Sequence, residues 1–144
     1  MKKLLSLLLI LPLLISASWR TDFSKAKTDA QKEGKYILLK FSGSDWCIPC
    51  IKMEKKVFDA KVFEEYAAKH LILVNADFPQ QKKNKPSKEI EQQNEMLAEQ
   101  YNKQGSFPFT VLMDDKGKVL KTWKGYNDAI TAELMVNQIK AIVE

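Results

Sequence analysis

The sequence predicts an α/β domain, with a β-sheet flanked by helices. Short, largely apolar runs typical of buried strands, such as 36–41 and 71–74, alternate with segments whose apolar residues recur at helical spacing. The only two cysteines of the chain, Cys47 and Cys50, follow the first of these runs, where a helix is predicted to begin. A strand that delivers a Cys-x-x-Cys pair to the start of a helix is typical of a redox-active dithiol.

Residues 1–18 have the three parts of a secretory signal peptide. A basic start is followed by the apolar stretch 4–15 and by the small residues 16–18, which suit signal peptidase. The apolar stretch is shorter than the roughly 20 residues that a membrane-spanning helix needs, and an uncleaved N-terminal anchor is the alternative. We therefore expect an exported protein, periplasmic or extracellular in a bacterium. Cleavage near Ser18 would leave a single domain over 19–144.

The first predicted helix ends at Glu33–Gly34, where the glycine can adopt the left-handed conformation of a helix cap. Its apolar positions, which share one face, are Phe23, Ala26 and Ala30. A buried strand is predicted at 36–41, followed by a loop at 42–45. The next helix begins at about Cys47 and extends to His70, with a break near Phe58–Asp59.

The second half of the chain continues the alternation. Leu71–Val74 reads as a buried strand that ends at 75–77, and the polar, basic loop 79–88 leads to a helix at about 88–102. Strands at 109–113 and 118–123, joined by the turn 114–117, predict a hairpin. The last helix is predicted over 128–143, with apolar positions at 130, 134, 135, 139 and 142.

Two other roles for the cysteine pair carry less weight than a reactive dithiol. A disulfide between residues three apart closes a very small loop, so it constrains the unfolded chain weakly. A metal site needs four ligands as a rule, and the chain adds only the lone His70. We interpret His70 as a residue at the C-terminus of a helix, where partial positive charge is favourable.

This order of elements, with Trp-Cys-Ile-Pro-Cys at 46–50, resembles the thioredoxin superfamily. The Gly-Ser-Phe-Pro sequence at 105–108, just before the hairpin, matches a second mark of that family, a proline that faces the dithiol. The residues at 43–47 and 52–54 are most similar to exported thioredoxin-like proteins. The resemblance covers roughly 21–143 and implies a thioredoxin fold, with a central mixed sheet of four or five strands.

The start of a helix gives the two cysteines different roles. Its free amides and macrodipole stabilise a thiolate, so Cys47 is expected to be the attacking sulfur. Cys50, three residues further on the same face, can resolve the mixed disulfide. Pro49 suits the first helical turn, where its missing amide would have no partner. Ile48 stands where the best-known thioredoxins carry glycine, and we expect it to tune the redox potential.

The resemblance also implies that the Phe107–Pro108 peptide bond is cis and lies next to Cys47, where it would pair with a substrate; a trans proline at a strand entry is the alternative. Trp46 is expected to shield the dithiol helix and to border the same substrate surface, although packing alone would explain it. Trp123 and Tyr126 are expected to be core and hairpin residues.

Two residues depart from the family pattern. Lys40 occupies the position of a buried acid that moves protons to the second cysteine in thioredoxin. A buried lysine must be neutral or paired, so it either lies near the thiols with a partner or turns its amine outward. In the first case it would stabilise the Cys47 thiolate and favour the reduced form. Asp45 lies two residues before Cys47, and we expect it to be solvated and of little effect.

The charge of the chain excludes one class of partner. The formal net charge is +5, of which two units come from Lys2 and Lys3, and aromatic residues do not alternate with basic ones. A nucleic-acid partner is therefore not expected. The basic loop at 80–88 is interpreted as a solvated loop, and an insertion that docks a partner protein is the alternative.

The sequence thus predicts an exported thiol-disulfide oxidoreductase that acts on protein disulfides without a bound cofactor or metal. We favour a monomeric reductase supplied with electrons by a membrane donor, because of Lys40 and the Trp-Cys-x-Pro-Cys sequence; an oxidant or isomerase stays open. A client-binding or chaperone module is a different class, which would use the groove beside Trp46, Phe107 and Pro108. A purely structural disulfide is the third interpretation.

Overall fold

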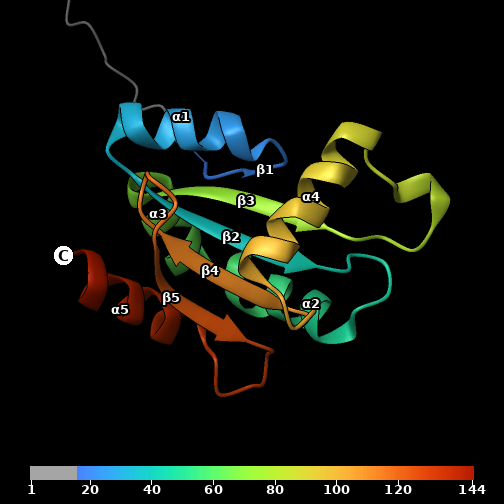
Figure 1. Ribbon diagram of the computed structural model, residues 1–144. Helices are drawn as coiled ribbons and strands as arrows, with labels where there is room; N and C mark the ends of the chain where they lie inside the picture. Colours follow the sequence, from blue (N-terminus) through green and yellow to red (C-terminus); the bar gives the residue numbers. More distant parts are fainter. Residues whose placement is uncertain (1–15) are drawn as a thin grey trace, which may run out of the picture.

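The computed structural model describes residues 16–144, so the predicted signal peptide lies outside the described residues except for 16–18. The core is one mixed sheet of five strands in the order β1-β3-β2-β4-β5 (Figure 1). β1, β3 and β2 are parallel, whereas β4 and β5 are antiparallel to their neighbours. The strands are β1 (Trp19–Arg20), β2 (Tyr36–Ser42), β3 (Leu71–Asp77), β4 (Phe109–Met113) and β5 (Val119–Lys124).

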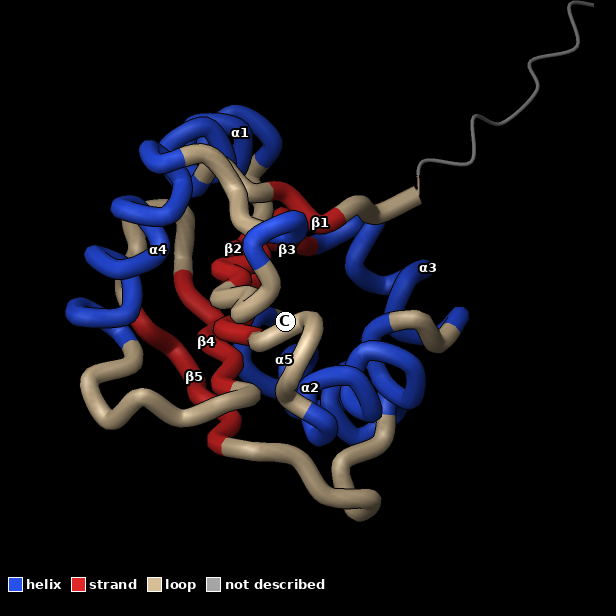
Figure 2. Tube along the Cα trace, turned by 90° about the vertical axis from the view of Figure 1, so that its right-hand side faces the viewer, coloured by secondary structure: helices blue, strands red, loops and turns tan. Residues whose placement is uncertain are grey.

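Helices cover both faces of this sheet. The helices are α1 (Phe23–Glu33), α2 (Ile48–Met53), the π-helical turn η1 (Glu54–Phe58), α3 (Lys61–His70), the 3₁₀ turn η2 (Lys82–Asn84), α4 (Lys88–Tyr101) and α5 (Ala132–Val143). α1 and α4 pack on one face, and α2, α3 and α5 pack on the other (Figure 2). Within residues 16–144, no helix combines the length and the apolar character needed to cross a membrane. The predicted α/β architecture with a mixed sheet is confirmed.

Most helix ends lie where the capping residues and breaks in the sequence predicted them. The Asp22 side chain accepts the Lys25 amide at the start of α1, and Gly34 ends the helix with φ of 63°. The predicted break near Phe58–Asp59 separates η1 from α3, and His70 is the last residue of α3.

Two boundaries differ from the predictions by three residues or more, and one strand was not predicted. β3 continues to Asp77 because its last three residues pair with β2, as far as Ser42. α5 begins at Ala132 rather than at 128, because the Thr131 hydroxyl accepts the Leu134 amide and caps the helix there. β1 was not predicted, since two residues are too few to show a periodicity.

The sheet topology brings the two family motifs to one end of the molecule. β2 runs toward the cysteine loop, and β4 begins just after Pro108. Because β2 and β4 are antiparallel, with Phe41 opposite Phe109, the end of β2 and the start of β4 lie side by side. β3 is parallel to β2, so the segment after Asp77 leaves the sheet at this same end.

Candidate active site

The two cysteines form a disulfide at the start of α2, with their Cα atoms 5.2 Å apart. Cys47 is the N-cap residue, and its sulfur accepts the backbone amide of Cys50 at 3.3 Å. Cys47 and Cys50 are 4% and 6% exposed, so their exposure does not indicate which sulfur attacks a substrate. Their positions differ, because only Cys47 lies at the N-cap. Pro49 occupies the first turn of α2, as predicted. A sulfur at a helix N-cap receives amide hydrogen bonds that favour its anionic form.

An aromatic cluster borders this disulfide. The rings of Trp46 and Phe78 each pack edge-on against Phe107, with centroid separations of 5.5 Å. The Trp46 indole also donates a hydrogen bond of 2.7 Å to the carbonyl of Phe78. Trp46 remains 39% exposed, and Ile48 beside it is 65% exposed. The cluster therefore joins the cysteine loop to the proline loop and leaves an apolar surface open to a partner.

Gly43 makes room for the Trp46 ring. A Cβ atom at this buried glycine would overlap the indole, which its hydrogen bond and its packing hold in place. We expect Gly43→Ala to displace the ring and to lower the free energy of unfolding by about 1 to 3 kcal/mol, the usual cost of overpacking. Denaturant unfolding measures this loss. The control is Gly43→Ala in a Trp46→Ala background, where the cost should nearly vanish; an equal cost in both backgrounds would contradict the explanation.

The proline loop is held by side-chain and backbone hydrogen bonds. The Phe107–Pro108 peptide bond is cis, as the resemblance implied. Asn102, which is buried, exchanges two hydrogen bonds with the backbone of Ser106, at 2.9 and 3.0 Å. The Pro108 carbonyl accepts the amide of Gly125 at 2.8 Å. Asn102 was not predicted, because an asparagine at the end of a helix is also an ordinary cap.

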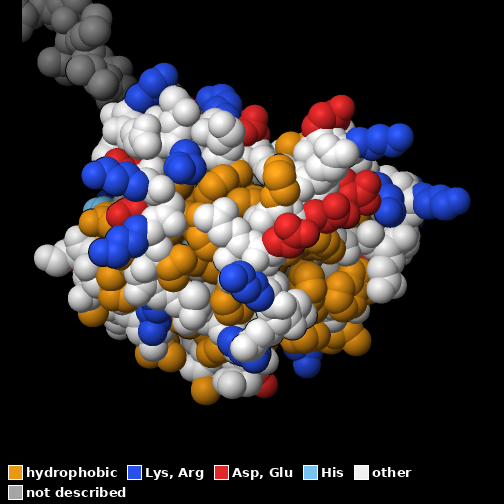
Figure 3. All heavy atoms as spheres, in the orientation of Figure 1, with side chains coloured by type: hydrophobic (Ala, Val, Ile, Leu, Met, Phe, Trp, Pro, Cys, Tyr) orange, Lys and Arg blue, Asp and Glu red, His pale blue; other side chains and the backbone are white. Residues whose placement is uncertain are grey.

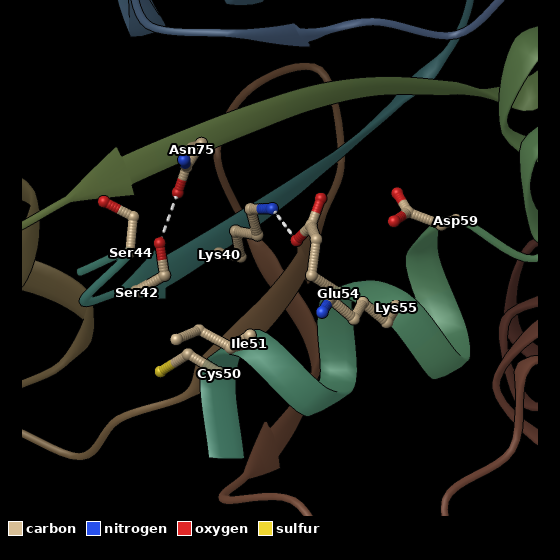
Figure 4. Close-up of a pocket in the computed structure, with 9 residues that line it drawn as sticks. All are labelled: Lys40, Ser42, Ser44, Cys50, Ile51, Glu54, Lys55, Asp59 and Asn75. Atoms are coloured by element: carbon tan, nitrogen blue, oxygen red, sulfur yellow. Dashed lines mark hydrogen bonds and ion pairs between the residues drawn. The ribbon is translucent and has the colours of Figure 1, made fainter. Parts of the chain in front are cut away.

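A cleft of about 350 Å³ lies beneath the dithiol helix (Figure 4). Lys40 from β2 extends into it and forms an ion pair with Glu54, the first residue of η1. The Lys40 side chain is only 6% exposed, whereas that of Glu54 is 34% exposed. Cys50 lines the same cleft, so the charged pair borders the second cysteine. Of the two expectations for Lys40, the outward-turned amine is wrong.

Two aromatic rings complete the surroundings of Lys40. Its ammonium lies 3.8 Å from the ring centroid of Trp19 and 5.2 Å from that of Phe58. Burial lowers the pKa of Lys40 below its usual range, and the charge of Glu54 opposes this shift. Ring faces attract a cation, so the rings compensate part of the lost hydration.

Glu54 and Trp19 were both missed as site residues. Glu54 follows Cys50 by four residues, and this spacing in a helix places two side chains on one face. That signal was present in the sequence. Trp19 belongs to β1, and no local pattern relates it to a lysine on another strand.

Polar groups line the sheet beside the cleft. The Ser42 hydroxyl hydrogen bonds to the Asn75 side chain at 2.8 Å (Figure 4). Thr110, which is opposite Lys40 on β4, is fully buried, and its hydroxyl has no hydrogen-bond partner among residues 16–144. The sheet therefore carries buried polar side chains at Lys40 and Thr110, which are opposite each other on β2 and β4.

Asp45 has hydrogen-bond partners that the sequence did not predict. Its carboxylate accepts hydrogen bonds of 2.9 Å from the amides of Gln80 and Gln81 and from the Asn84 side chain. The Asn84 hydrogen bond, followed by that of the Gln80 amide, lowers the pKa of Asp45. Asp45 thus ties the cysteine loop to the loop after β3. The sequence-based expectation of a solvated carboxylate did not include these hydrogen bonds, because their partners are 35 to 39 residues away along the chain.

A second cleft of about 200 Å³ opens beside the exposed face of α2, lined by Ile48, Pro49, Lys52 and residues 126–128. Tyr126 also packs against the core, so the prediction of a core or hairpin residue describes only part of its environment. Trp123 is buried as predicted, and its indole donates to Gln138 at 2.7 Å. Among the described residues, no three His, Cys, Asp or Glu side chains are grouped to hold a metal ion.

Comparison with known proteins gives consistent matches. A family model described as a thioredoxin-like domain matches residues 23–140. The disulfide bond reductase DsbH of Chlamydia pneumoniae is 40% identical over 99 residues, which cover 69% of this chain and 58% of that protein. The thioredoxin-related protein DsbJ of the same organism is 30% identical over 99 residues, 68% of this chain and 27% of that protein. The chain therefore spans less than two thirds of the length of either relative.

Solved structures give the same picture of the fold. A structure of a DsbH oxidoreductase has a TM-score of 0.78 at 32% identity, covering 88% of this chain and 84% of that chain. The C-terminal domain of DsbD from Neisseria meningitidis, in its oxidised form, has a TM-score of 0.56 at 16% identity, covering 83% and 90%. At that identity, the second match supports the fold alone.

Proposed function

Because the chain belongs to the thioredoxin-like family, we propose that it is a thiol-disulfide oxidoreductase that reduces protein disulfides with Cys47 and Cys50. The observation that carries this proposal is the pair of sulfurs at the start of α2, bonded to each other and bordered by the exposed residues Trp46 and Ile48. No cofactor or metal is needed for such an exchange, since the electrons come from the two thiols.

The reaction has two steps. The Cys47 thiolate attacks one sulfur of the substrate disulfide, so a mixed disulfide forms and the other substrate sulfur leaves as a thiolate that takes up a proton. Cys50 then loses its proton and attacks the Cys47 sulfur, which releases the second substrate thiol. The substrate gains two electrons, and the protein is left with the Cys47–Cys50 disulfide. A dithiol donor must reduce it before the next cycle.

The aromatic surface and the proline loop would position the substrate. The Trp46 ring packs against Phe107, which precedes Pro108, and Trp46 and Ile48, the residues on either side of Cys47, are exposed. We assign substrate contact to these residues and redox tuning to Ile48, Pro49 and Lys40. The exposed apolar groups would equally suit a client-binding module, which is the second candidate function.

The charge beside Cys50 bears on the direction of electron transfer. An unpaired ammonium would stabilise the thiolate, and a couple whose reduced form is stabilised becomes more oxidising, which argues against a reductase. The sequence-based preference for a reductase therefore used Lys40 with the wrong sign. The negative charge of Glu54 opposes this field, so the preference rests instead on the similarity to a disulfide bond reductase.

The setting of the reaction follows from this proposal. We propose export across a membrane on the basis of residues 1–18, protein disulfides as substrates, a membrane protein as the electron donor and a monomer as the active form. Export, the electron donor and the monomeric state can each be tested separately from the dithiol chemistry.

The direct test is equilibration of the Cys47–Cys50 pair in glutathione buffers of graded ratio. We expect a reduction potential near the thioredoxin value of about −270 mV, as a reductase requires. A potential of about −120 to −180 mV would instead indicate an oxidant or an isomerase. A pair that does not cycle between the two forms would contradict the proposal.

A further inference from the structure

The segment after β3 is strongly basic. Residues 78–88, which we call the basic arm, contain four lysines and no acidic residue. The arm leaves the sheet at the end that carries the dithiol, because β3 is parallel to β2. In Figure 3, cationic side chains project from the edge of the molecule where this arm lies in Figure 1.

The arm is fastened to the cysteine loop. Asp45 accepts two amides and the Asn84 side chain of the arm, each at 2.9 Å. The Trp46 indole donates to the Phe78 carbonyl at 2.7 Å, and the Phe78 amide donates to Ser42 at 2.8 Å. Four of these five hydrogen bonds reach Asp45 and Trp46, the two residues that precede Cys47. These bonds tie residues on both sides of Lys82 and Lys83 to the cysteine loop.

Three lysines of the arm are exposed and make no ion pair among residues 16–144, namely Lys82, Lys83 and Lys88, the first residue of α4. Lys82 and Lys83 belong to the 3₁₀ turn η2. Lys85 is paired with Glu91 at 3.0 Å. Lys52 adds a positive charge in the small cleft beside Ile48, where Asp128 opposes it.

Three carboxylates near the cysteine loop are already engaged, whereas Asp128 lines the cleft beside Ile48 and makes no ion pair among residues 16–144. Asp45 is bonded to the arm, Asp77 accepts the Ser44 amide at 2.9 Å, and Glu54 is paired with Lys40. The helix α4, which follows the arm in the chain, carries Glu89, Glu91, Glu95 and Glu99, and Figure 3 shows acidic side chains on the face where α4 lies in Figure 1. A negatively charged partner would be repelled by α4 and drawn to the tip of the arm.

We propose that the basic arm selects protein disulfides whose cysteines are flanked by acidic residues. This inference rests on the proposed function, because it concerns the substrates of the same dithiol. Charges at the rim of an interface act mainly on the rate of encounter and weaken with salt. The arm therefore speeds the approach of an acidic segment to Cys47 and leaves the chemical steps unchanged.

The test uses three synthetic peptide disulfides that differ only in the residues beside the cysteine, which are acidic, neutral or basic. At low salt, the full chain is expected to reduce the acidic peptide roughly tenfold faster than the basic one, and the ratio should approach one at about 0.5 M salt. The variant Lys82→Glu/Lys83→Glu should invert this preference while the rate with the neutral peptide stays the same.

The matched control is Lys32→Glu/Lys116→Glu. These lysines are exposed and make no ion pair among residues 16–144; Lys32 lies near the end of α1 and Lys116 in the β4–β5 turn, away from the dithiol end. This control changes the net charge equally and should preserve the preference. Equal rates for all three peptides, the same inversion in both variants, or a slower neutral peptide in the Lys82/Lys83 variant would overturn the proposal. Failure to reduce even the neutral peptide would instead contradict the proposed function.

Discussion

Replacing Cys47 with serine is expected to lower the rate of protein disulfide reduction by at least about a thousandfold, because the hydroxyl is not a nucleophile toward sulfur at neutral pH. Cys50→Ser should behave differently. It keeps the attacking thiolate and lacks the resolving thiol, so a mixed disulfide with the substrate should accumulate. The measurement is turnover for both variants, together with the fraction of protein that is covalently trapped.

The two variants are matched controls for each other, since each removes the Cys47–Cys50 disulfide. Their thermal unfolding should therefore change by similar amounts, while only Cys50→Ser traps substrate. Trapping by Cys47→Ser in place of Cys50→Ser would reverse the assigned roles. Full binding and protection of an unfolded client by Cys47→Ser, with no turnover by the unmodified protein, would favour the client-binding function.

Glu54→Gln is expected to lower the free energy of unfolding at neutral pH by about 3 kcal/mol. The substitution leaves the Lys40 ammonium buried without its counter-charge, and breaking a buried pair in this way typically costs about 3 to 5 kcal/mol. We take the lower end because the Glu54 side chain is 34% exposed and the Trp19 ring also faces the ammonium. Denaturant unfolding measures the loss.

The loss should shrink as the pH rises toward 10. Burial lowers the pKa of Lys40 in the folded protein, and removal of Glu54 lowers it further. The unfolded chain keeps this lysine protonated up to about pH 10.4. Between the folded and the unfolded pKa the unfolded state binds more protons, so the free energy of unfolding of Glu54→Gln increases with pH.

A double-mutant cycle separates this effect from packing. Lys40→Met/Glu54→Gln should recover most of the stability, because no buried charge remains. Glu65→Gln is the exposed control: it removes an ion pair with Lys61, and it should cost less than about 1 kcal/mol. A loss in Glu54→Gln that is independent of pH and persists in the double variant would contradict the explanation.

The same variants test whether the pair tunes the dithiol. Glu54→Gln leaves a positive charge beside Cys50 and should raise the reduction potential, whereas Lys40→Met leaves a negative charge and should lower it. Shifts of about 10 to 30 mV correspond to roughly 0.5 to 1.4 kcal/mol for a two-electron couple. A purely structural role would not produce shifts of opposite sign.

Local patterns predicted most of the fold. The spacing of Ala26 and Ala30, the left-handed position of Gly34 and the break after Phe58 depend on residues within a few positions of one another. The hairpin at 109–124 follows from two apolar runs around a polar turn. β1 escaped prediction because a strand of two residues exists only through its pairing with β3.

The sequence by itself determined the α/β order of elements, the Cys47–Cys50 pair at a helix start and the proline before the hairpin. These are properties of short segments, whose backbone preferences and side-chain spacing are local. Only the tertiary structure decided that Lys40 pairs with Glu54 beneath Trp19 and that Asp45 holds the basic arm. Such contacts join strands, helices and loops that packing of the core brings together, and the energy of a buried charge depends on what surrounds it in space.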